Sequence, residues 1–186
     1  MPISILSEEV INQIAAGEVI ENPASVVKEL IENSIDAAAK RIEIEILSGG
    51  LELIKVSDDG HGMNRVDAEL SLVRHATSKI SNLTDLDRLQ TMGFRGEALA
   101  AIASVSKLEI LTGNGTESVR VVSQGGRIEK IEIARRNRGT TVEVKALFFN
   151  APARRKFQKS SQANNTAVAK VIQQIALAHP EISFIF

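Results

Sequence analysis

Short strand patterns joined by glycine-containing turns limit the possible folds of this sequence more than any other feature. Residues 41–47 (RIEIEIL) alternate polar and apolar side chains, SGG turns the chain, and LELIKVS returns with the same alternation. A period of two indicates a half-buried strand, so this segment predicts a β-hairpin with its isoleucines on one face. Four more strand patterns follow between residues 107 and 147, separated by GNG, QGG and NRG turns. The chain is therefore expected to contain a sheet of hairpin-connected strands.

Helical patterns occupy separate stretches of the chain. Asn22 followed by Pro23 predicts an N-cap and a first-turn proline, leading into the helix ASVVKELIENSIDAAAK. The other expected helices are 7–17, 64–75, 97–105 and 164–179. Because helices and hairpins are segregated and do not alternate as β-α-β units, we predict an α+β fold, a two-layer sandwich with helices on one face of the sheet.

Residues 1–186 are expected to form a single domain. The polar stretch 76–96 is too long for an ordinary connection and predicts a functional loop or lid. The final residues, HPEISFIF, resemble a strand that has just begun, so we expect a fragment of a longer chain.

Composition excludes several classes of function. The 186 residues carry a net charge of -1 and no cysteine, which argues against a general nucleic-acid surface, disulfides and thiolate metal sites and fits a reducing cytoplasm. No stretch approaches the length of a membrane span. A P-loop, a GxGxxG motif, a GxSxG elbow and an HExxH motif are all absent.

The predicted helix that begins at Pro23 has a polar edge beside its apolar face. Glu29 and Asn33 are separated by four residues and so lie side by side on a helix, with Asp36 on the same edge. A carboxylate beside a neutral oxygen ligand suits a general base on water next to a Mg²⁺ ligand. A solvated helix edge explains this pair equally simply when it is considered alone.

Two glycine-containing stretches add other groups. In SDDGHGM, Asp58 ends a predicted strand and offers an acceptor for a ligand amino group, while Gly60 and Gly62 allow close approach of backbone to a ligand. Ordinary turn chemistry is the alternative. In TMGFRGEALAAIA, Gly93 and Gly96 flank a loop that opens a helix, where backbone N–H groups favour phosphate, although capping alone also explains the glycines.

Two local basic clusters, ARRNRG at 134–139 and PARRKFQK at 152–159, are candidates for contact with DNA phosphates. A solvated surface is the alternative for both clusters.

The order of the motifs resembles a known superfamily. ENSIDA, DDGHGM, TMGFRGEAL and GTTVEV occur in the order of the four nucleotide-site motifs of the GHKL ATPases. More narrowly, QIAAGEVIENPASVVKELIENSIDA, RHATSKI, GFRGEAL and LFFNAPARRKF resemble the MutL family of mismatch-repair proteins, over about residues 3–157. The resemblance implies the Bergerat fold, a mixed, mostly antiparallel sheet covered on one face by helices, with ATP between sheet and helices under a lid.

The resemblance also implies roles for individual residues. Glu29 matches the general base, Asn33 the Mg²⁺ ligand and Asp58 the acceptor for the adenine amino group. The remaining expected ATP contacts are Gly60, Gly62 and Met63 in the adenine loop, Lys79 in the lid, Gly93, Phe94, Arg95 and Gly96 in the phosphate loop, and Thr140 or Thr141 beside the adenine.

The sequence leads to three hypotheses about function. The first is a slow, Mg²⁺-dependent ATPase in which nucleotide orders the lid and controls homodimerisation of the full-length protein and its contacts with mismatch-recognition proteins, downstream repair proteins and DNA. The second is a nucleotide-gated interaction module with negligible hydrolysis in this chain. The third is a structural domain with no ligand.

Overall fold

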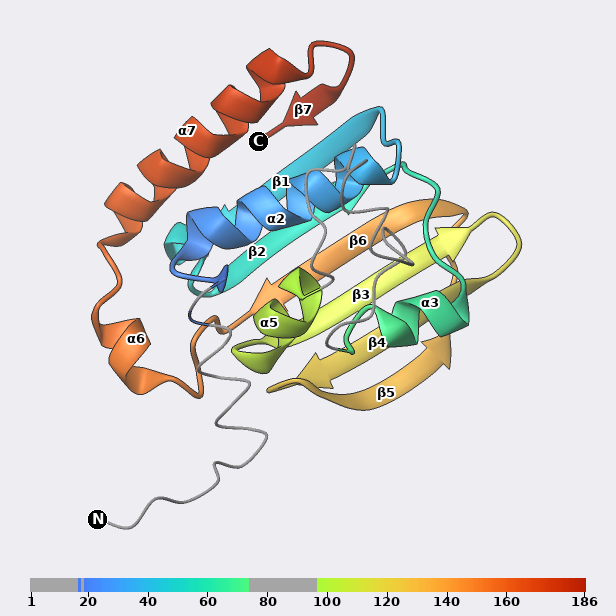
Figure 1. The fold of residues 1–186 in the computed structure, drawn as a ribbon, viewed down its shortest axis with the longest axis horizontal. Coiled ribbons are helices and arrows are strands. Elements are labelled where there is room, and N and C mark those ends of the chain that lie inside the picture. The colour runs from blue at the N-terminus through green and yellow to red at the C-terminus, as the bar shows by residue number, and fades with distance from the viewer. Residues whose placement is uncertain (1–16, 18, 74–96) are drawn as a thin grey trace, which may run out of the picture.

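The computed structural model describes residues 17, 19–73 and 97–186, built around a seven-stranded sheet of order β5-β4-β3-β6-β2-β1-β7 (Figure 1). The strands are β1 (Arg41–Leu47), β2 (Leu53–Asp58), β3 (Lys107–Asn114), β4 (Ser118–Gln124), β5 (Arg127–Ile133), β6 (Arg138–Lys145) and β7 (Ser183–Ile185). The pairing is parallel between β1 and β7 and antiparallel between the other neighbours. The predicted mixed, mostly antiparallel sheet is confirmed.

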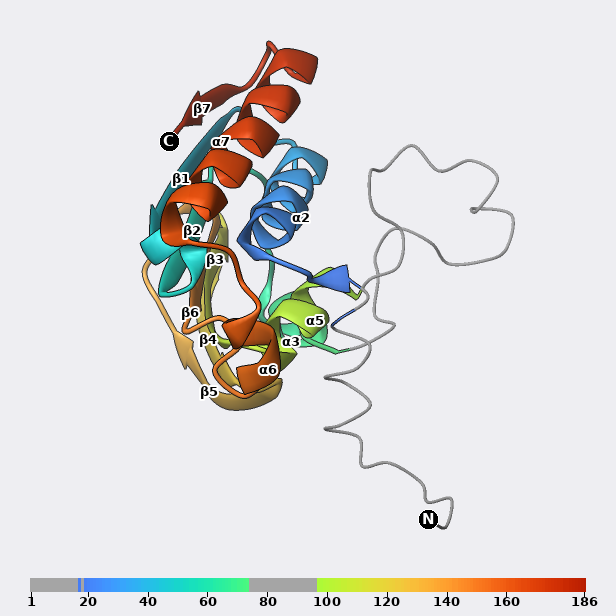
Figure 2. The same cartoon turned by 90° about the vertical axis from the view of Figure 1, so that its left-hand side faces the viewer.

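The helices gather on one side of this sheet. They are α2 (Pro23–Asp36), α3 (Arg65–Leu70), α5 (Ala98–Ser104), α6 (Pro152–Lys156) and α7 (Ser161–Ala178), with a short 3-10 turn, η1 (Ser48–Gly50). Figure 2 shows α2, α3, α5 and α7 on the same face, so the predicted two-layer α+β sandwich is confirmed. Within the described residues, no helix combines the length and the apolar character that crossing a membrane requires.

Helix α2 begins where the sequence predicts. The Asn22 side chain accepts a hydrogen bond from the Ser25 N–H at 3.1 Å, and Pro23 occupies the first turn. The helix ends at Asp36, four residues earlier than the pattern indicated, because Ala38 has a positive φ of 57° that a right-handed helix cannot accommodate.

Other boundaries differ in small ways from the sequence prediction. Helix α3 is capped by the Asn64 side chain, so it begins close to the predicted start, but it ends at Leu70, before the predicted end at residue 75. The short helix α6 lies in the PARRKFQK cluster, where no helix was predicted. The predicted N-terminal helix, apart from its last residue, and the whole expected lid, residues 76–96, lie outside the described residues.

The two faces of the sheet differ sharply in chemistry. The inner face packs under the helices through buried branched side chains: Ile42, Ile44, Ile54, Val56, Leu108, Ile110, Val119, Val121, Val142 and Val144. The outer face carries a continuous row of ion pairs: Glu45, Lys55, Glu143, Lys145, Glu109, Arg120, Glu132 and Lys130. Alternation along each strand produces both surfaces from the same residues.

The turn after β2 packs tightly against the ends of β3 and β6. Gly62 has a φ of 67°, and a Cβ atom there would lie 1.9 Å from the Gly113 carbonyl oxygen. A Cβ atom at Gly139 would lie 2.1 Å from the carbonyl oxygen of Asp58. Backbone therefore approaches backbone at this corner, at distances that only glycine allows.

We predict that Gly62→Ala destabilises the fold by at least about 3 kcal/mol, since it adds a backbone clash to the strain of positive φ. Gly115→Ala is the control, because Gly115 also has a positive φ, 92°, but a Cβ atom there would meet nothing within 4 Å among the described residues. Strain alone predicts a loss of about 1 kcal/mol there. Urea unfolding of both variants is the measurement, and equal losses would contradict the prediction.

Candidate functional site

Asp58 stands at the inner face of the sheet, at the last position of β2. The alternation that turns Ile54 and Val56 towards the helices turns Asp58 the same way, and only 8% of the residue is exposed. A carboxylate at such a position costs free energy unless hydrogen bonds compensate for the water it loses. Its surroundings are therefore informative about its role.

Three hydrogen-bond donors surround this carboxylate. Oδ1 accepts hydrogen bonds from the Gly60 N–H at 2.9 Å and the Thr140 N–H at 3.1 Å. Oδ2 lies 3.0 Å from the Ser34 hydroxyl, which also lies 3.1 Å from the Leu30 carbonyl oxygen and has one proton to donate. Oδ1 is thus saturated by backbone donors, while Oδ2 retains capacity to accept from a ligand.

Burial raises the pKa of Asp58 above its ordinary value. The hydrogen bonds from Gly60, Ser34 and Thr140 and the charge of Arg136 act in the opposite direction and reduce that rise. Since backbone N–H groups already occupy Oδ1, a proton that bound to Asp58 would sit on Oδ2. Protonation would turn Oδ2 from an acceptor into a donor.

Two threonines extend the site along the sheet. The Thr112 and Thr140 hydroxyls lie 3.0 Å apart on neighbouring inner-face positions of β3 and β6. Thr112 also accepts a hydrogen bond from the Met63 N–H at 2.9 Å, which ties the glycine turn to the sheet. The structure therefore brings together Asp58, Gly60, Gly62, Met63 and Thr140, all from the sequence-predicted set.

Thr141 lies on the other face of the sheet. It pairs with Ser57, and their hydroxyl oxygens are 2.8 Å apart. The Arg136 guanidinium donates to the Thr141 hydroxyl at 2.6 Å. Of the two threonines left open by the sequence, the structure places Thr140 with Asp58 and Thr141 away from the carboxylate.

Glu29 and Asn33 lie one turn apart on α2, the helix that also supplies Ser34. Both residues are partly exposed, whereas Ser34 is buried. Among the described residues, the Asn33 side chain has no hydrogen-bond partner, so its oxygen is available to a ligand. Helix α2 thus carries Ser34, which contacts Asp58, together with the predicted general base and the predicted Mg²⁺ ligand.

A preformed metal cage is absent from the described part of the chain, where no three His, Cys, Asp or Glu side chains form a group able to hold a metal ion. Mg²⁺ does not require one, because it keeps several waters and takes one or two protein ligands together with substrate phosphates. A single available amide oxygen at Asn33 fits that mode of binding.

Five predicted contacts lie outside the described residues: Lys79, Gly93, Phe94, Arg95 and Gly96. The described chain resumes at Glu97, and α5 begins at Ala98, where the sequence predicted a helix after the phosphate loop.

Sequence reasoning missed three residues that contact this cluster: Ser34, Thr112 and Arg136. A signal existed for two of them. Ser34 is a polar residue on the buried side of an amphipathic helix, and Thr112 continues the inward series of Leu108 and Ile110. Nothing in ARRNRG distinguished Arg136 from its exposed neighbours, because two of its partners, Ser57 and Asp58, are on a strand distant in sequence.

Comparison with known proteins agrees with this geometry. A family model described as histidine kinase-, DNA gyrase B-, and HSP90-like ATPase matches residues 20–145. The DNA mismatch repair protein MutL of Dictyoglomus turgidum is 53% identical over 183 residues, covering 98% of this chain and 32% of that protein. MutL of Caldanaerobacter subterraneus is 53% identical over 184 residues, with 98% and 31% covered. The chain therefore spans about a third of the length of these relatives.

Solved structures give the same assignment. The Aquifex aeolicus MutL ATPase domain complexed with ADP superposes with a TM-score of 0.74 at 35% identity, covering 89% of this chain and 59% of that one. The N-terminal domain of a DNA repair protein superposes with a TM-score of 0.79 at 36% identity, with 94% and 50% covered. The chain belongs to the histidine kinase-, DNA gyrase B- and HSP90-like ATPase family, and within it to the MutL DNA mismatch-repair proteins.

Proposed function

We propose that this chain binds ATP with Mg²⁺ and hydrolyses it slowly, as the N-terminal ATPase domain, residues 1–186, of a cytoplasmic DNA mismatch-repair protein. The observation that carries the proposal is the Asp58 carboxylate, buried at the end of β2 with one oxygen saturated and the other able to accept. The ADP complex of a MutL ATPase domain that is 35% identical supports the choice of ligand.

Base recognition is assigned to the end of β2 and its neighbours. Oδ2 of Asp58 accepts a hydrogen bond from the exocyclic amino group of adenine, and Thr140 lies beside it. Gly60 and Gly62 keep this corner free of side chains: a Cβ atom at Gly60 would lie 2.7 Å from the Ala37 carbonyl oxygen. Close packing of the turn fixes the carboxylate in position before the ligand arrives.

Hydrolysis is assigned to the polar edge of α2. Glu29 accepts a proton from the water that attacks the terminal phosphate, a role for which a partly exposed carboxylate near bound phosphate is suited. Asn33 would hold Mg²⁺, which supplies positive charge to the phosphates when bound. Lys79 and residues 93–96 are proposed to contact the phosphates.

DNA contact is assigned to α6 and the residues after it. Arg155, Lys156 and Lys159 are exposed there, and Phe157 is 84% exposed. The other basic cluster is a weaker candidate, because Arg136 turns towards the end of β2. Homodimerisation of the full-length protein and contacts with mismatch-recognition and downstream repair proteins are proposed from the relatives' identity as mismatch-repair proteins.

The first test is nucleotide selectivity in the parent chain. We predict that ATP with Mg²⁺ raises the melting temperature and that GTP does so far less, since guanine presents a carbonyl where adenine presents an amino donor. A site built to pair with a ligand N–H rejects an analogue that lacks it by at least about 100-fold. Calorimetric titration gives both affinities. Equal affinities would remove Asp58 as the adenine acceptor.

We predict that Asp58→Asn loses at least about 100-fold in ADP affinity, since an amide N–H would replace the accepting Oδ2. Stability at neutral pH should not fall. The pKa of folded Asp58 is raised, so its ionised form lowers stability above that pKa, and this cost is absent below the unfolded value. Asp59→Asn is the control. The Asp59 carboxylate accepts from the Lys40 and Arg41 N–H groups, so this variant should retain ADP and lose some stability.

We predict that Glu29→Gln binds ATP within about threefold of the parent but slows hydrolysis at least about 100-fold, because a general base acts chiefly in the transition state. Glu32→Gln is the control on the same helix, since Glu32 pairs with Lys28 at 3.5 Å. Single-turnover phosphate release with excess protein measures hydrolysis, and calorimetric titration measures binding. Unchanged hydrolysis in Glu29→Gln would rule out this base, and hydrolysis absent from the parent would favour a nucleotide-gated interaction module.

A further inference from the structure

Arg136 lies beneath the proposed base-recognition site, on the opposite face of the sheet. Its guanidinium donates to the Asp58 carbonyl oxygen at 2.7 Å, to the Thr141 hydroxyl at 2.6 Å and, more weakly, to the Ser57 hydroxyl at 3.4 Å. Ser57 and Thr141 are a directly opposed pair on β2 and β6. The guanidinium therefore joins these two strands at the point where β2 delivers Asp58 to the inner face.

The partners of Arg136 are unusual for a half-buried cation. Its side-chain hydrogen bonds in the described part of the chain all go to hydroxyl and carbonyl oxygens, and its Nε–H is buried without a partner. Burial lowers the pKa of Arg136, and the Asp58 carboxylate across the sheet opposes that change. Asp58 is thus the acid whose charge acts on this guanidinium.

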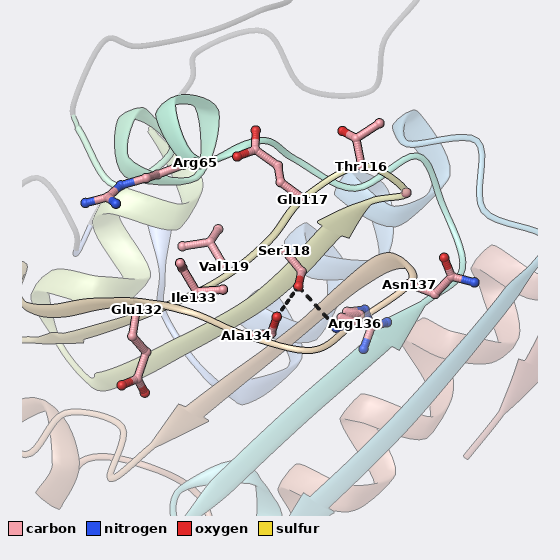
Figure 3. A pocket seen from close by; sticks show the side chains of 11 residues that line it. Arg65, Thr116, Glu117, Ser118, Val119, Glu132, Ile133, Ala134, Arg136 and Asn137 are labelled. Atoms are coloured by element: carbon pink, nitrogen blue, oxygen red, sulfur yellow. Dashed lines mark hydrogen bonds between the residues drawn. The ribbon is translucent and has the colours of Figure 1, made fainter.

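A hollow of about 470 Å³ borders Arg136 (Figure 3). It also includes Arg65, Glu117 and Glu132 from α3, the β3–β4 turn and β5. The Ser118 hydroxyl accepts from the Arg136 N–H at 3.3 Å, so backbone as well as side-chain contacts hold the arginine at this corner.

We propose that Arg136 is a positioning residue for Asp58, which from the outer face of the sheet fixes the end of β2 and keeps the Asp58 carboxylate able to accept a base amino group. This inference rests on the proposed function and adds a residue that determines base recognition without touching the base. Arg136 has two separable contributions: a forked set of hydrogen bonds, and a positive charge that favours the ionised carboxylate.

The positive charge acts on a carboxylate with few other titratable neighbours. The groups that contact Asp58 are the Ser34 hydroxyl from α2 and the N–H groups of Gly60 and Thr140, none of which titrates. The elements that supply these groups also carry titratable residues: Glu29 and Asp36, partly exposed on α2, and Asp59 and His61, exposed in the turn. Among the described residues, Arg136 is the charged side chain that lowers the pKa of Asp58.

The test compares Arg136→Gln, Arg136→Lys and the parent in ADP titrations from about pH 8.5 down to about pH 5, with Arg135→Gln as an exposed neighbouring control. The ratio of variant to parent Kd at each pH cancels the titration of the nucleotide itself. Without the positive charge the Asp58 pKa should rise, so the ratio for Arg136→Gln should grow as pH falls. If the substitution raises the Asp58 pKa by one unit, the Kd ratio should grow by about tenfold at pH values below the Asp58 pKa of both proteins.

Arg136→Lys separates charge from geometry. It should show a constant ratio across pH, since the charge remains while the fork is lost, and Arg135→Gln should show a ratio near one throughout. A ratio for Arg136→Gln that is raised equally at every pH would mean that Arg136 only joins the strands, and would overturn the proposal.

A second measurement uses no nucleotide. Carboxyl NMR titration of the ligand-free protein reports the Asp58 midpoint directly, and Arg136→Gln should raise it relative to the parent while Arg136→Lys should not. An unchanged midpoint overturns the inference about Arg136. If the parent binds no ADP at any pH, the proposed function fails instead. If Arg136→Gln does not fold, a shifted midpoint in the folded Arg136→Lys variant would also count against the charge contribution.

Discussion

The buried carboxylate of Asp58 is the constraint on which the rest of this corner of the molecule depends. Water is largely excluded, so hydrogen bonds from α2, the glycine turn and β6 must replace it. Each donor comes from a different element, and each element must therefore hold its place to within the length of a hydrogen bond. Burial of Asp58 costs free energy unless β2, α2, the glycine turn and β6 meet at this point. A carboxylate held in this way by several elements is well suited to recognise a ligand.

Because side chains alternate along the strands, the proposed base-recognition residues and Arg136 lie on opposite faces of the sheet. At the end of β2 and the start of β6, Asp58 and Thr140 face the helices, while Ser57 and Thr141 face outward. The outward pair receives Arg136, and the outer face beyond it is a row of ion pairs. Exposed ion pairs add little stability individually, but they keep the uncovered face of the sheet polar. The end of β2 thus presents the Asp58 carboxylate on the inner face of the sheet and is contacted by Arg136 on the outer face.

Helix α2 connects the proposed base-recognition site to the residues proposed for hydrolysis. Ser34 contacts Asp58, and Asn33 and Glu29 lie on the preceding turn of the same helix. The helix packs against the sheet through its buried face, which includes Val26, Leu30 and Ile31. The spacing between Asp58, the proposed adenine acceptor, and Glu29, the proposed base, is consequently set by core packing. The polar edge, which the sequence left open to a solvated explanation, lies on the helix that contacts the buried Asp58 carboxylate through Ser34.

The sequence by itself determined the strands, the start of α2 and the stretches that supply Asp58, Gly60, Gly62, Met63 and Thr140, because alternation, caps and glycine turns act over a few neighbouring residues. Asn22 with Pro23 marked the start of α2, and RIEIEIL with LELIKVS marked the hairpin that delivers Asp58. Tertiary structure decided the end of α2, the short α6, the choice of Thr140 over Thr141, and the parts played by Ser34, Thr112 and Arg136. Those outcomes depend on which strands become neighbours: Thr140 meets Asp58 across 82 positions of sequence, and Arg136 meets it across 78. No local pattern encodes such a pairing, which is fixed only when the sheet assembles and buries the carboxylate.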